Sequence, residues 1–193
     1  PEQDMPLLWQ QNAVRDALVA ALTLDIFNRH ADCVFMANLA QTVNVLQSLI
    51  LTDGPRMVLT PTFHVYEMYA DHQGGRCVPL RLESDEVSFD GGHGRRSIPC
   101  LSGSASQKEN ALTVTLTNAH AREARDVAIA LKGARVAEAQ AQVLTGDAIR
   151  AHNTFDEPQA VAPRSARVPK GGGEGLSVML APASVTKLRL ELS

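Results

Sequence analysis

Apolar residues recur with the period of an α-helix over residues 12–30. They fall at i, i+4, i+7, i+8 and i+12 and form one stripe, which consists of Val14, Leu18, Ala21, Leu22 and Ile26. Asn12 precedes the stripe in the position of an N-cap, and Arg29 and His30 bring positive charge to the last turn, where it suits the helix dipole. The pattern predicts an amphipathic helix over residues 12–30.

The next apolar run is short and breaks into polar residues. Val34, Phe35 and Met36 predict a strand over residues 34–38 that is buried on both faces, as parallel strands are. Polar side chains crowd the positions past its C-terminal end, namely Asn38, Gln41, Thr42 and Asn44. In α/β folds such positions carry ligand-contacting groups, but Asn38 or Thr42 could instead cap a helix predicted over residues 41–51. Spacing alone favours the cap and leaves the ligand-contacting alternative open.

A turn and a further helix complete the first part of the chain. Residues 52–55, with the sequence TDGP, predict a turn, and the apolar residues 57–59 follow it. A third helix is predicted over residues 62–72, with Val65, Met68 and Tyr69 on one side.

After Gly74 the helical period gives way to alternation with a period of two. In residues 112–117 (LTVTLT) apolar residues alternate with threonines, and in residues 187–192 (KLRLEL) they alternate with charges, which is typical of half-buried antiparallel strands. Strands are predicted over residues 77–82, 87–89, 98–101, 112–117, 127–131, 136–144, 176–180 and 185–192. Joined by Gly, Ser and Pro turns, they predict a β-sandwich or jelly roll. The change of pattern predicts one domain of residues 1–74 and another of residues 75–193.

Composition narrows the class of protein. The 193 residues are 45% hydrophobic and 20% charged, which is typical of a globular protein. No apolar run approaches the ~20 residues that a bilayer requires, and the net charge of −3 does not favour nucleic acid, so neither membrane nor nucleic acid is expected as a partner. The odd and scattered cysteines, Cys33, Cys77 and Cys100, favour a reducing compartment, and a cytoplasmic location is expected. Because the chain does not begin with Met, a preceding segment is also expected.

No motif predicts a metal site, a cofactor or a catalytic pair within the chain. The six histidines include no HExxH motif and no i, i+4 pair, and the cysteines match no zinc spacing. The glycine-rich residues 91–94 and 171–175 lie between predicted strands, where hairpin turns or loops are expected rather than a phosphate cradle. Carboxylates are expected on solvent faces or in turns, namely Asp16, Asp25, Asp53, Glu67 and Asp71.

Long stretches of the chain resemble one known family. Residues 15–54, which contain ANLAQTVNVLQ, and residues 57–73, which contain LTPTFHVYEMY, resemble the end of the catalytic domain of the α-L-arabinofuranosidases of glycoside hydrolase family 51. Residues 112–121 and residues 143–158, with the motif AHNTF, resemble that family's C-terminal sandwich. The resemblance implies an α/β plus all-β fold, with the last units of a (β/α)8 TIM barrel in residues 1–74 and an antiparallel, jelly-roll-like β-sandwich after them.

The resemblance also implies a function. Enzymes of this family remove terminal α-L-arabinofuranosyl residues from arabinoxylan, arabinan and arabino-oligosaccharides with retention of configuration, which requires two carboxyl groups about 5–5.5 Å apart. It implies that both are glutamates upstream of Pro1, because no matching motif occurs here, and that this chain alone is inactive. It implies that the amide of Gln41 contacts the sugar and that the full-length enzyme is a homo-oligomer. The alternative is a non-catalytic β-sandwich that serves as a carbohydrate-binding or assembly module.

Overall fold

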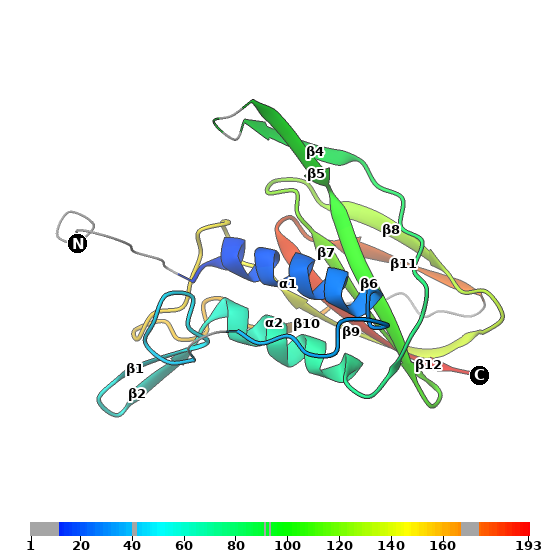
Figure 1. Ribbon diagram of the computed structural model, residues 1–193, viewed down its shortest axis with the longest axis horizontal. Helices are drawn as coiled ribbons and strands as arrows, with labels where there is room; N and C mark the ends of the chain where they lie inside the picture. Colours follow the sequence, from blue (N-terminus) through cyan, green and yellow to red (C-terminus); the bar gives the residue numbers. More distant parts are fainter. Residues whose placement is uncertain (1–11, 40–41, 91, 93, 167–173) are drawn as a thin grey trace.

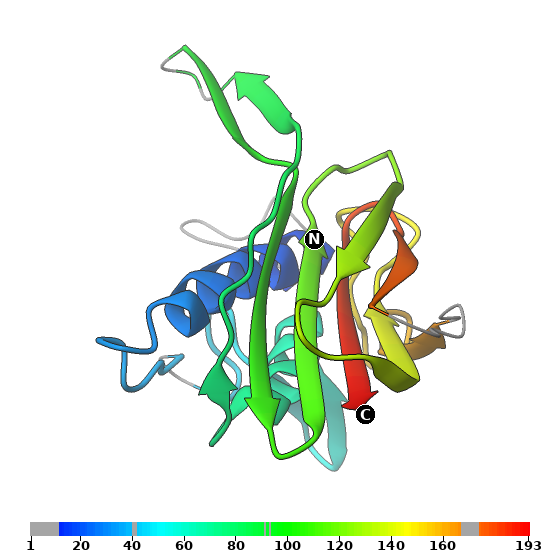
Figure 2. The same ribbon diagram turned by 90° about the vertical axis from the view of Figure 1, so that its right-hand side faces the viewer.

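A six-stranded antiparallel sheet forms the centre of the structure, with the strand order β10-β9-β12-β7-β6-β3 (Figure 1). The structure is a computed structural model and describes residues 12–39, 42–90, 92, 94–166 and 174–193. The central strands are β3 (Arg76–Cys77), β6 (Leu101–Lys108), β7 (Ala111–Asn118), β9 (Val136–Leu144), β10 (Arg164–Ala166) and β12 (Ser184–Leu192). Two helices lie on one side of this sheet, and the antiparallel pair β8 (Arg125–Ala130) and β11 (Gly175–Leu180) lies on the other (Figure 2). The predicted antiparallel β-sandwich is therefore confirmed.

Helix α1 (Val14–Arg29) confirms the helix predicted over residues 12–30. Its buried residues include Val14, Leu18 and Ala21 of the predicted stripe, whereas Ile26 is 47% exposed. The prediction that Asn12 caps the helix is wrong, because Ala13 is the N-cap. The backbone N–H of Ala13 donates to Asp16 Oδ2 at 2.8 Å, so a carboxylate one turn into the helix performs the capping.

The strand predicted over residues 34–38 and the helix predicted over residues 41–51 are both wrong for the described residues. Residues 34–39 have no regular structure, and residues 42–49 form turns with one isolated bridge between Val43 and Ile50. Asn44 and Gln47 have positive φ angles of 52° and 56°, which are incompatible with a continuous helix. A parallel strand requires neighbours to accept and donate its backbone hydrogen bonds, and the described part of the chain supplies none beside residues 34–38.

The hairpin and helix that follow agree with the sequence. Strands β1 (Ile50–Asp53) and β2 (Arg56–Leu59) flank the predicted turn, and helix α2 (Pro61–Tyr69) continues as the 3₁₀ turn η2 (Ala70–His72). Thr60 caps α2 through its hydroxyl, which accepts a hydrogen bond from the N–H of Phe63 at 3.3 Å. Pro61 occupies the first helical position, where its missing N–H costs no hydrogen bond.

The alternating residues of β7 and β12 build the core of the sandwich. Their apolar side chains face β8 and β11 and form one cluster that includes Leu112, Val114, Leu116, Val127, Val178, Leu180, Leu188 and Leu190. The threonines of β7 point the opposite way and are buried as well, with Thr115 and Thr117 fully inaccessible. The expectation of a half-buried strand is therefore wrong for β7, because α1 covers its polar face.

A second core joins the helices to the ends of the sheet. It contains residues from α1 and α2 together with residues from β9, β12 and the loops, including Val14, Leu18, Val65, Met68, Leu144, Val161 and Val185. Residues on both sides of Gly74 thus share one buried cluster, and the division into residues 1–74 and 75–193 stays a prediction.

A two-stranded hairpin projects from the body of the molecule, at the top of Figures 1 and 2. It consists of β4 (Glu86–Asp90) and β5 (Arg95–Pro99), which pair only with each other among the described strands. Phe89 and Ile98 are 44% and 37% exposed on it. No helix of the described residues is both long and apolar enough to cross a membrane.

Candidate functional site

The polar segment predicted to contact a ligand lies partly outside the described residues. Gln41 is one of the residues that the structure does not describe, while Asn38 and Thr42 on either side are exposed. The Asn44 side chain links this loop to β1, because its amide N–H donates to Thr52 O at 3.1 Å and its amide oxygen accepts from Thr52 N at 2.7 Å. No helix begins among the described residues of this segment, so the capping interpretation of Asn38 and Thr42 is wrong.

Three of the five carboxylates lie at the surface, as expected. Asp53 pairs with Arg56, Glu67 approaches His64 Nδ1 at 3.1 Å, and Asp71 pairs with Lys187 Nζ at 2.6 Å. The expectation is wrong for Asp16, which is 7% exposed and receives the N–H of Ala13 and the guanidinium of Arg15. Each of these carboxylates therefore already has a structural partner.

The expectation is also wrong for Asp25, which lies fully buried between α1 and the central sheet. Its carboxylate accepts hydrogen bonds from Tyr69 OH at 2.7 Å, Ser104 Oγ at 3.0 Å, Thr115 Oγ1 at 3.1 Å and Thr117 Oγ1 at 3.3 Å. Burial raises the pKa of Asp25 above its usual value of 3.8, because the loss of hydration outweighs the hydroxyl donors that favour the charged form. Burial, followed by the charge of Asp25, likewise raises the pKa of Tyr69.

The same face of the sheet holds further polar partners of the helices. The His72 ring contacts Ser106 Oγ at 2.7 Å through Nδ1 and Thr115 Oγ1 at 3.2 Å through Nε2. Burial lowers the pKa of His72 from 6.5 to about 4, so the ring is neutral near pH 7. Arg29 at the end of α1 donates to Gly103 O at 2.7 Å.

These groups form a buried polar network rather than an open reaction site. Asp25 is fully buried and the neutral His72 ring is 8% exposed, and their hydrogen bonds fix the helices on the sheet. This network cannot be predicted from the sequence, because the alternation of Ser and Thr with apolar residues is the same whether the polar face of the strand is exposed to water or covered by a helix.

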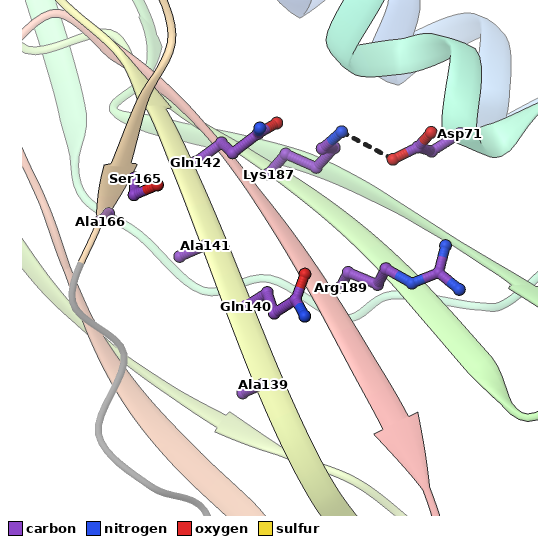
Figure 3. Close-up of a pocket in the computed structure, with 9 residues that line it drawn as sticks. All are labelled: Asp71, Ala139, Gln140, Ala141, Gln142, Ser165, Ala166, Lys187 and Arg189. Atoms are coloured by element: carbon purple, nitrogen blue, oxygen red, sulfur yellow. Dashed lines mark hydrogen bonds and ion pairs between the residues drawn. The ribbon is translucent and has the colours of Figure 1, made fainter.

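A surface hollow of about 460 Å³ opens on the helix-facing side of β9 and β12 (Figure 3). Its floor is a ladder in which Gln142 lies opposite Lys187 and Gln140 opposite Arg189. Asp71 pairs with Lys187 and Glu191 pairs with Arg189, so the hollow combines amides with two cations that carboxylates neutralise. Such groups can hydrogen-bond a neutral polar ligand, including a sugar.

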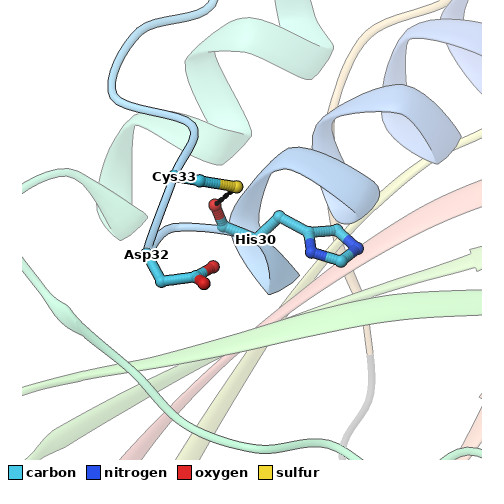
Figure 4. Close-up of side chains that lie close together, drawn as sticks. All are labelled: His30, Asp32 and Cys33. Atoms are coloured by element: carbon cyan, nitrogen blue, oxygen red, sulfur yellow. Dashed lines mark hydrogen bonds between the residues drawn. The ribbon is translucent and has the colours of Figure 1, made fainter.

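One group among the described residues has the donor atoms and spacing that could hold a metal ion, and the expectation that the chain has no metal site stays a prediction. The group consists of His30, Asp32 and Cys33, whose side chains surround the turn after α1 (Figure 4). The sequence contains no histidine pair at this place, but it does place His30 and Cys33 three residues apart.

Comparisons with known proteins point to one family. Residues 2–184 match the family model of the α-L-arabinofuranosidase C-terminal domain. The chain is 37% identical over 185 residues to the intracellular exo-α-L-arabinofuranosidase of Bacteroides ovatus. A crystal structure of the glycoside hydrolase family 51 arabinofuranosidase from Xanthomonas axonopodis pv. citri superimposes with a TM-score of 0.88 at 40% identity. The α-L-arabinofuranosidase from Thermotoga maritima, solved with arabinose, gives a TM-score of 0.81 at 26% identity.

The similarity covers nearly all of this chain but only part of each relative. The match to the Bacteroides ovatus protein includes 95% of this chain and 35% of that protein. The match to the Xanthomonas axonopodis structure includes 95% of this chain and 37% of that one, and the match to the Thermotoga maritima structure includes 93% of this chain and 38% of that one. The chain therefore spans about a third of the length of the relatives that it matches.

Proposed function

Because the chain belongs to the α-L-arabinofuranosidases of glycoside hydrolase family 51, as their C-terminal domain, we propose that it is part of an enzyme that removes terminal α-L-arabinofuranosyl residues from arabinoxylan, arabinan and arabino-oligosaccharides. The observation that carries this proposal is the match over 95% of the chain to a named arabinofuranosidase. The mechanism proposed is retaining hydrolysis by two carboxyl groups, one acting as acid and base and the other as nucleophile.

The two catalytic carboxylates belong, in this proposal, to a part of the enzyme that precedes Pro1. The state of the carboxylates in this chain supports the assignment. Asp16 and Asp25 are buried in hydrogen bonds, and Asp53, Glu67 and Asp71 are engaged with neighbouring cationic side chains or a histidine. Glu67 and Asp71 line one surface hollow, but each is engaged there with another side chain, His64 and Lys187 respectively, and not with a second carboxyl group as retaining hydrolysis requires.

An exposed apolar surface supports packing against the catalytic part. Phe35 is 97% exposed and Met36 is 67% exposed in the segment that follows α1, and Val43 and Leu46 further along are 44% and 49% exposed. Exposed apolar groups clustered along one segment are typical of a surface that another part of a protein covers. We therefore assign residues 1–74 to the end of the catalytic barrel, in which residues 34–38 would gain the neighbouring strands that they lack here.

Gln41 is the residue of this chain that we propose as a sugar contact. In this proposal it follows residues 34–38 within the end of the barrel, and the described residues on either side, Asn38 and Thr42, are exposed. An amide both donates to and accepts from sugar hydroxyls, and it carries no charge that could replace the catalytic acids. Its role is therefore to hold the arabinose ring rather than to react.

The assembly and the location of the enzyme are also proposals. The β4–β5 hairpin supports a homo-oligomer, because an isolated two-stranded hairpin is marginal in water and Phe89 lies exposed on it. Light scattering of the enzyme with and without residues 86–99 tests this. The name of the Bacteroides ovatus relative supports action inside the cell, which fractionation of the native host tests.

Hydrolysis of 4-nitrophenyl α-L-arabinofuranoside tests the main proposal. The protein extended upstream of Pro1 should release nitrophenol, and the 193-residue chain should not, because without both carboxylates it lacks most of the ~8–23 kcal/mol by which enzymes lower a barrier. Turnover by the purified 193-residue chain that disappears in Glu67→Gln or Asp53→Asn would contradict the proposal.

The hollow of Figure 3 supports a second candidate function, that of a carbohydrate-binding module. Its ladder of Gln140, Gln142, Lys187 and Arg189 offers hydrogen bonds to hydroxyls, although the described residues that line it include no aromatic ring. Titration of the chain with arabino-oligosaccharides tests this candidate. Binding that is lost in Gln140→Ala/Gln142→Ala but kept in Gln107→Ala would favour it, and no heat of binding would exclude it.

A further inference from the structure

The turn after α1 brings together three side chains with different donor atoms. An imidazole nitrogen of His30, a carboxylate oxygen of Asp32 and the sulfur of Cys33 all lie within 4.8 Å of one another (Figure 4). All three residues are exposed, so solutes can reach the donor atoms. Cys33 is a free thiol, and its Sγ makes only a weak contact with the carbonyl oxygen of His30 at 3.5 Å.

The backbone of the turn is held in place before any ligand binds. The carbonyl oxygen of His30 accepts hydrogen bonds from Cys33 N at 3.0 Å and Val34 N at 2.8 Å, which closes the turn around the three side chains. The residue before it, Arg29, is anchored to the sheet through Gly103 O at 2.7 Å. A ligand would therefore need to order only three side-chain rotamers and not a loop, which keeps the entropic cost of binding small.

The donor set matches a particular class of ion. Nitrogen, oxygen and sulfur from His, Asp and Cys are the ligands that Zn²⁺ accepts, at bond lengths of about 2.0–2.3 Å. A tetrahedral site with such bonds places its ligand atoms about 3.5 Å apart, so the three side chains need to close by about 1 Å. The site also lies at the C-terminal end of α1, where the partial negative charge of the helix favours a cation.

We propose that His30, Asp32 and Cys33 bind a divalent transition-metal ion of the Zn²⁺ or Co²⁺ type, with water in the fourth position. On binding, the S–H bond of Cys33 breaks, the sulfur–metal bond forms and the proton passes to the buffer. The inference does not depend on the proposed arabinofuranosidase activity, because it concerns only the geometry of residues 30–33.

Titration with Co²⁺ tests the site directly. We expect the reduced, chelator-treated chain to develop a thiolate-to-cobalt charge-transfer band in the near ultraviolet and to release a proton as it does so. Cys33→Ala should abolish the band. Cys77→Ala, which removes a thiol of β3 away from the turn, is the matched control and should keep it.

Two further variants separate a three-ligand site from a lone thiol. His30→Ala and Asp32→Asn should each weaken Co²⁺ binding more than about tenfold, since even partners outside the coordination sphere typically cost that much. All three side chains are exposed, so circular dichroism should show each variant folded. The proposal is overturned if the native chain gives no band, if Cys33→Ala keeps it, or if His30→Ala and Asp32→Asn bind as tightly as the native chain.

Discussion

Replacement of Asp25 tests why a carboxylate lies buried between α1 and the sheet. The two informative changes are Asp25→Ala, which removes the acceptor, and Asp25→Asn, which keeps its shape and removes its charge. If the cost of burying the charge exceeds the gain from the hydroxyl donors, as the raised pKa of Asp25 indicates, these two variants differ widely in stability. If the charge itself stabilises the fold, they are equally damaging.

The expected cost of Asp25→Ala follows from the hydroxyls that it leaves behind. The Tyr69 hydroxyl can still donate to Ala21 O at 3.2 Å, and the Thr115 hydroxyl to Ser104 O at 3.5 Å. The Thr117 hydroxyl donates only to Asp25 in the described part of the structure. One or two buried donors without an acceptor, at about 1–3 kcal/mol each, predict a loss of about 2–4 kcal/mol.

Asp25→Asn should cost much less, about 0–1 kcal/mol. The amide oxygen can still accept from two hydroxyls, and the amide N–H groups can donate to the others, because a hydroxyl also accepts. The substitution removes a buried charge that no Lys, Arg or His contacts in the described residues. The loss of strong charge-assisted bonds and the relief of desolvation therefore nearly cancel.

The pH dependence gives an independent check. Since the pKa of Asp25 is raised in the folded chain, the folded state holds this proton more tightly than the unfolded state. The stabilisation that comes from this tighter binding of the proton is complete below about pH 3.8, and it is lost as the pH rises through the raised pKa of Asp25. The Asn variant, which does not titrate, should therefore gain stability relative to the native chain across that window.

Urea denaturation at pH 7, followed by circular dichroism, measures the three free energies of unfolding. Asp147→Asn changes an exposed carboxylate outside the network and serves as the control, with an expected change below about 0.5 kcal/mol. An Asp25→Asn variant as unstable as Asp25→Ala would refute the reasoning, because it would show that the ionised carboxylate stabilises the fold.

Three further predictions concern other parts of the chain. In the full enzyme, Gln41→Ala should lower kcat/KM for an aryl arabinofuranoside, with a loss of ~1–3 kcal/mol in the free energy of transition-state binding. An unchanged kcat/KM would show that Gln41 does not contact the sugar. Because the pKa of His72 is lowered to about 4 in the folded chain, the neutral ring stabilises the fold above pH 6.5, and about 3 kcal/mol of this stability is lost as the pH falls toward 4. His72→Gln should remove this pH dependence from thermal melts. Residues 1–74 expressed alone should show no cooperative thermal transition, since Val65 and Met68 pack on Val185 and Leu144 of the sheet; a sharp transition would count against this.

The sequence predicts the helices and the sandwich because local pattern and tertiary packing agree there. The period of α1 and the proline at the start of α2 determine those helices, and the alternation in β7 and β12 determines their strands. Strand β6 is mostly missed because its sequence, LSGSASQK, has few large apolar residues. Its alternate serines face α1 rather than water, and that cover comes from a distant part of the chain.

The segment at residues 34–51 shows the opposite case. Its apolar run predicts a strand correctly only if neighbouring strands exist, and the described residues provide no sheet at that place. Phe35 is consequently exposed and the polar residues after it form turns. A parallel strand is a property of a whole sheet, so a pattern that is strong locally fails without its neighbours. The group of His30, Asp32 and Cys33 was not expected for a simpler reason, since its spacing matches none of the zinc-site patterns.

The buried network around Asp25 has a consequence for how the helices find their place. Three hydroxyls from neighbouring strands, those of Ser104, Thr115 and Thr117, converge on this one carboxylate. An apolar side chain at residue 25 could fill the same volume but would leave one or two of the buried hydroxyl donors unpaired, at about 1–3 kcal/mol each. A shift of α1 by one turn would separate the carboxylate from all three, so the network penalises wrong positions more than it stabilises the right one. We infer that Asp25 specifies the position of α1 on the sheet, and that the segment leading to Gln41 starts from a helix end fixed in this way.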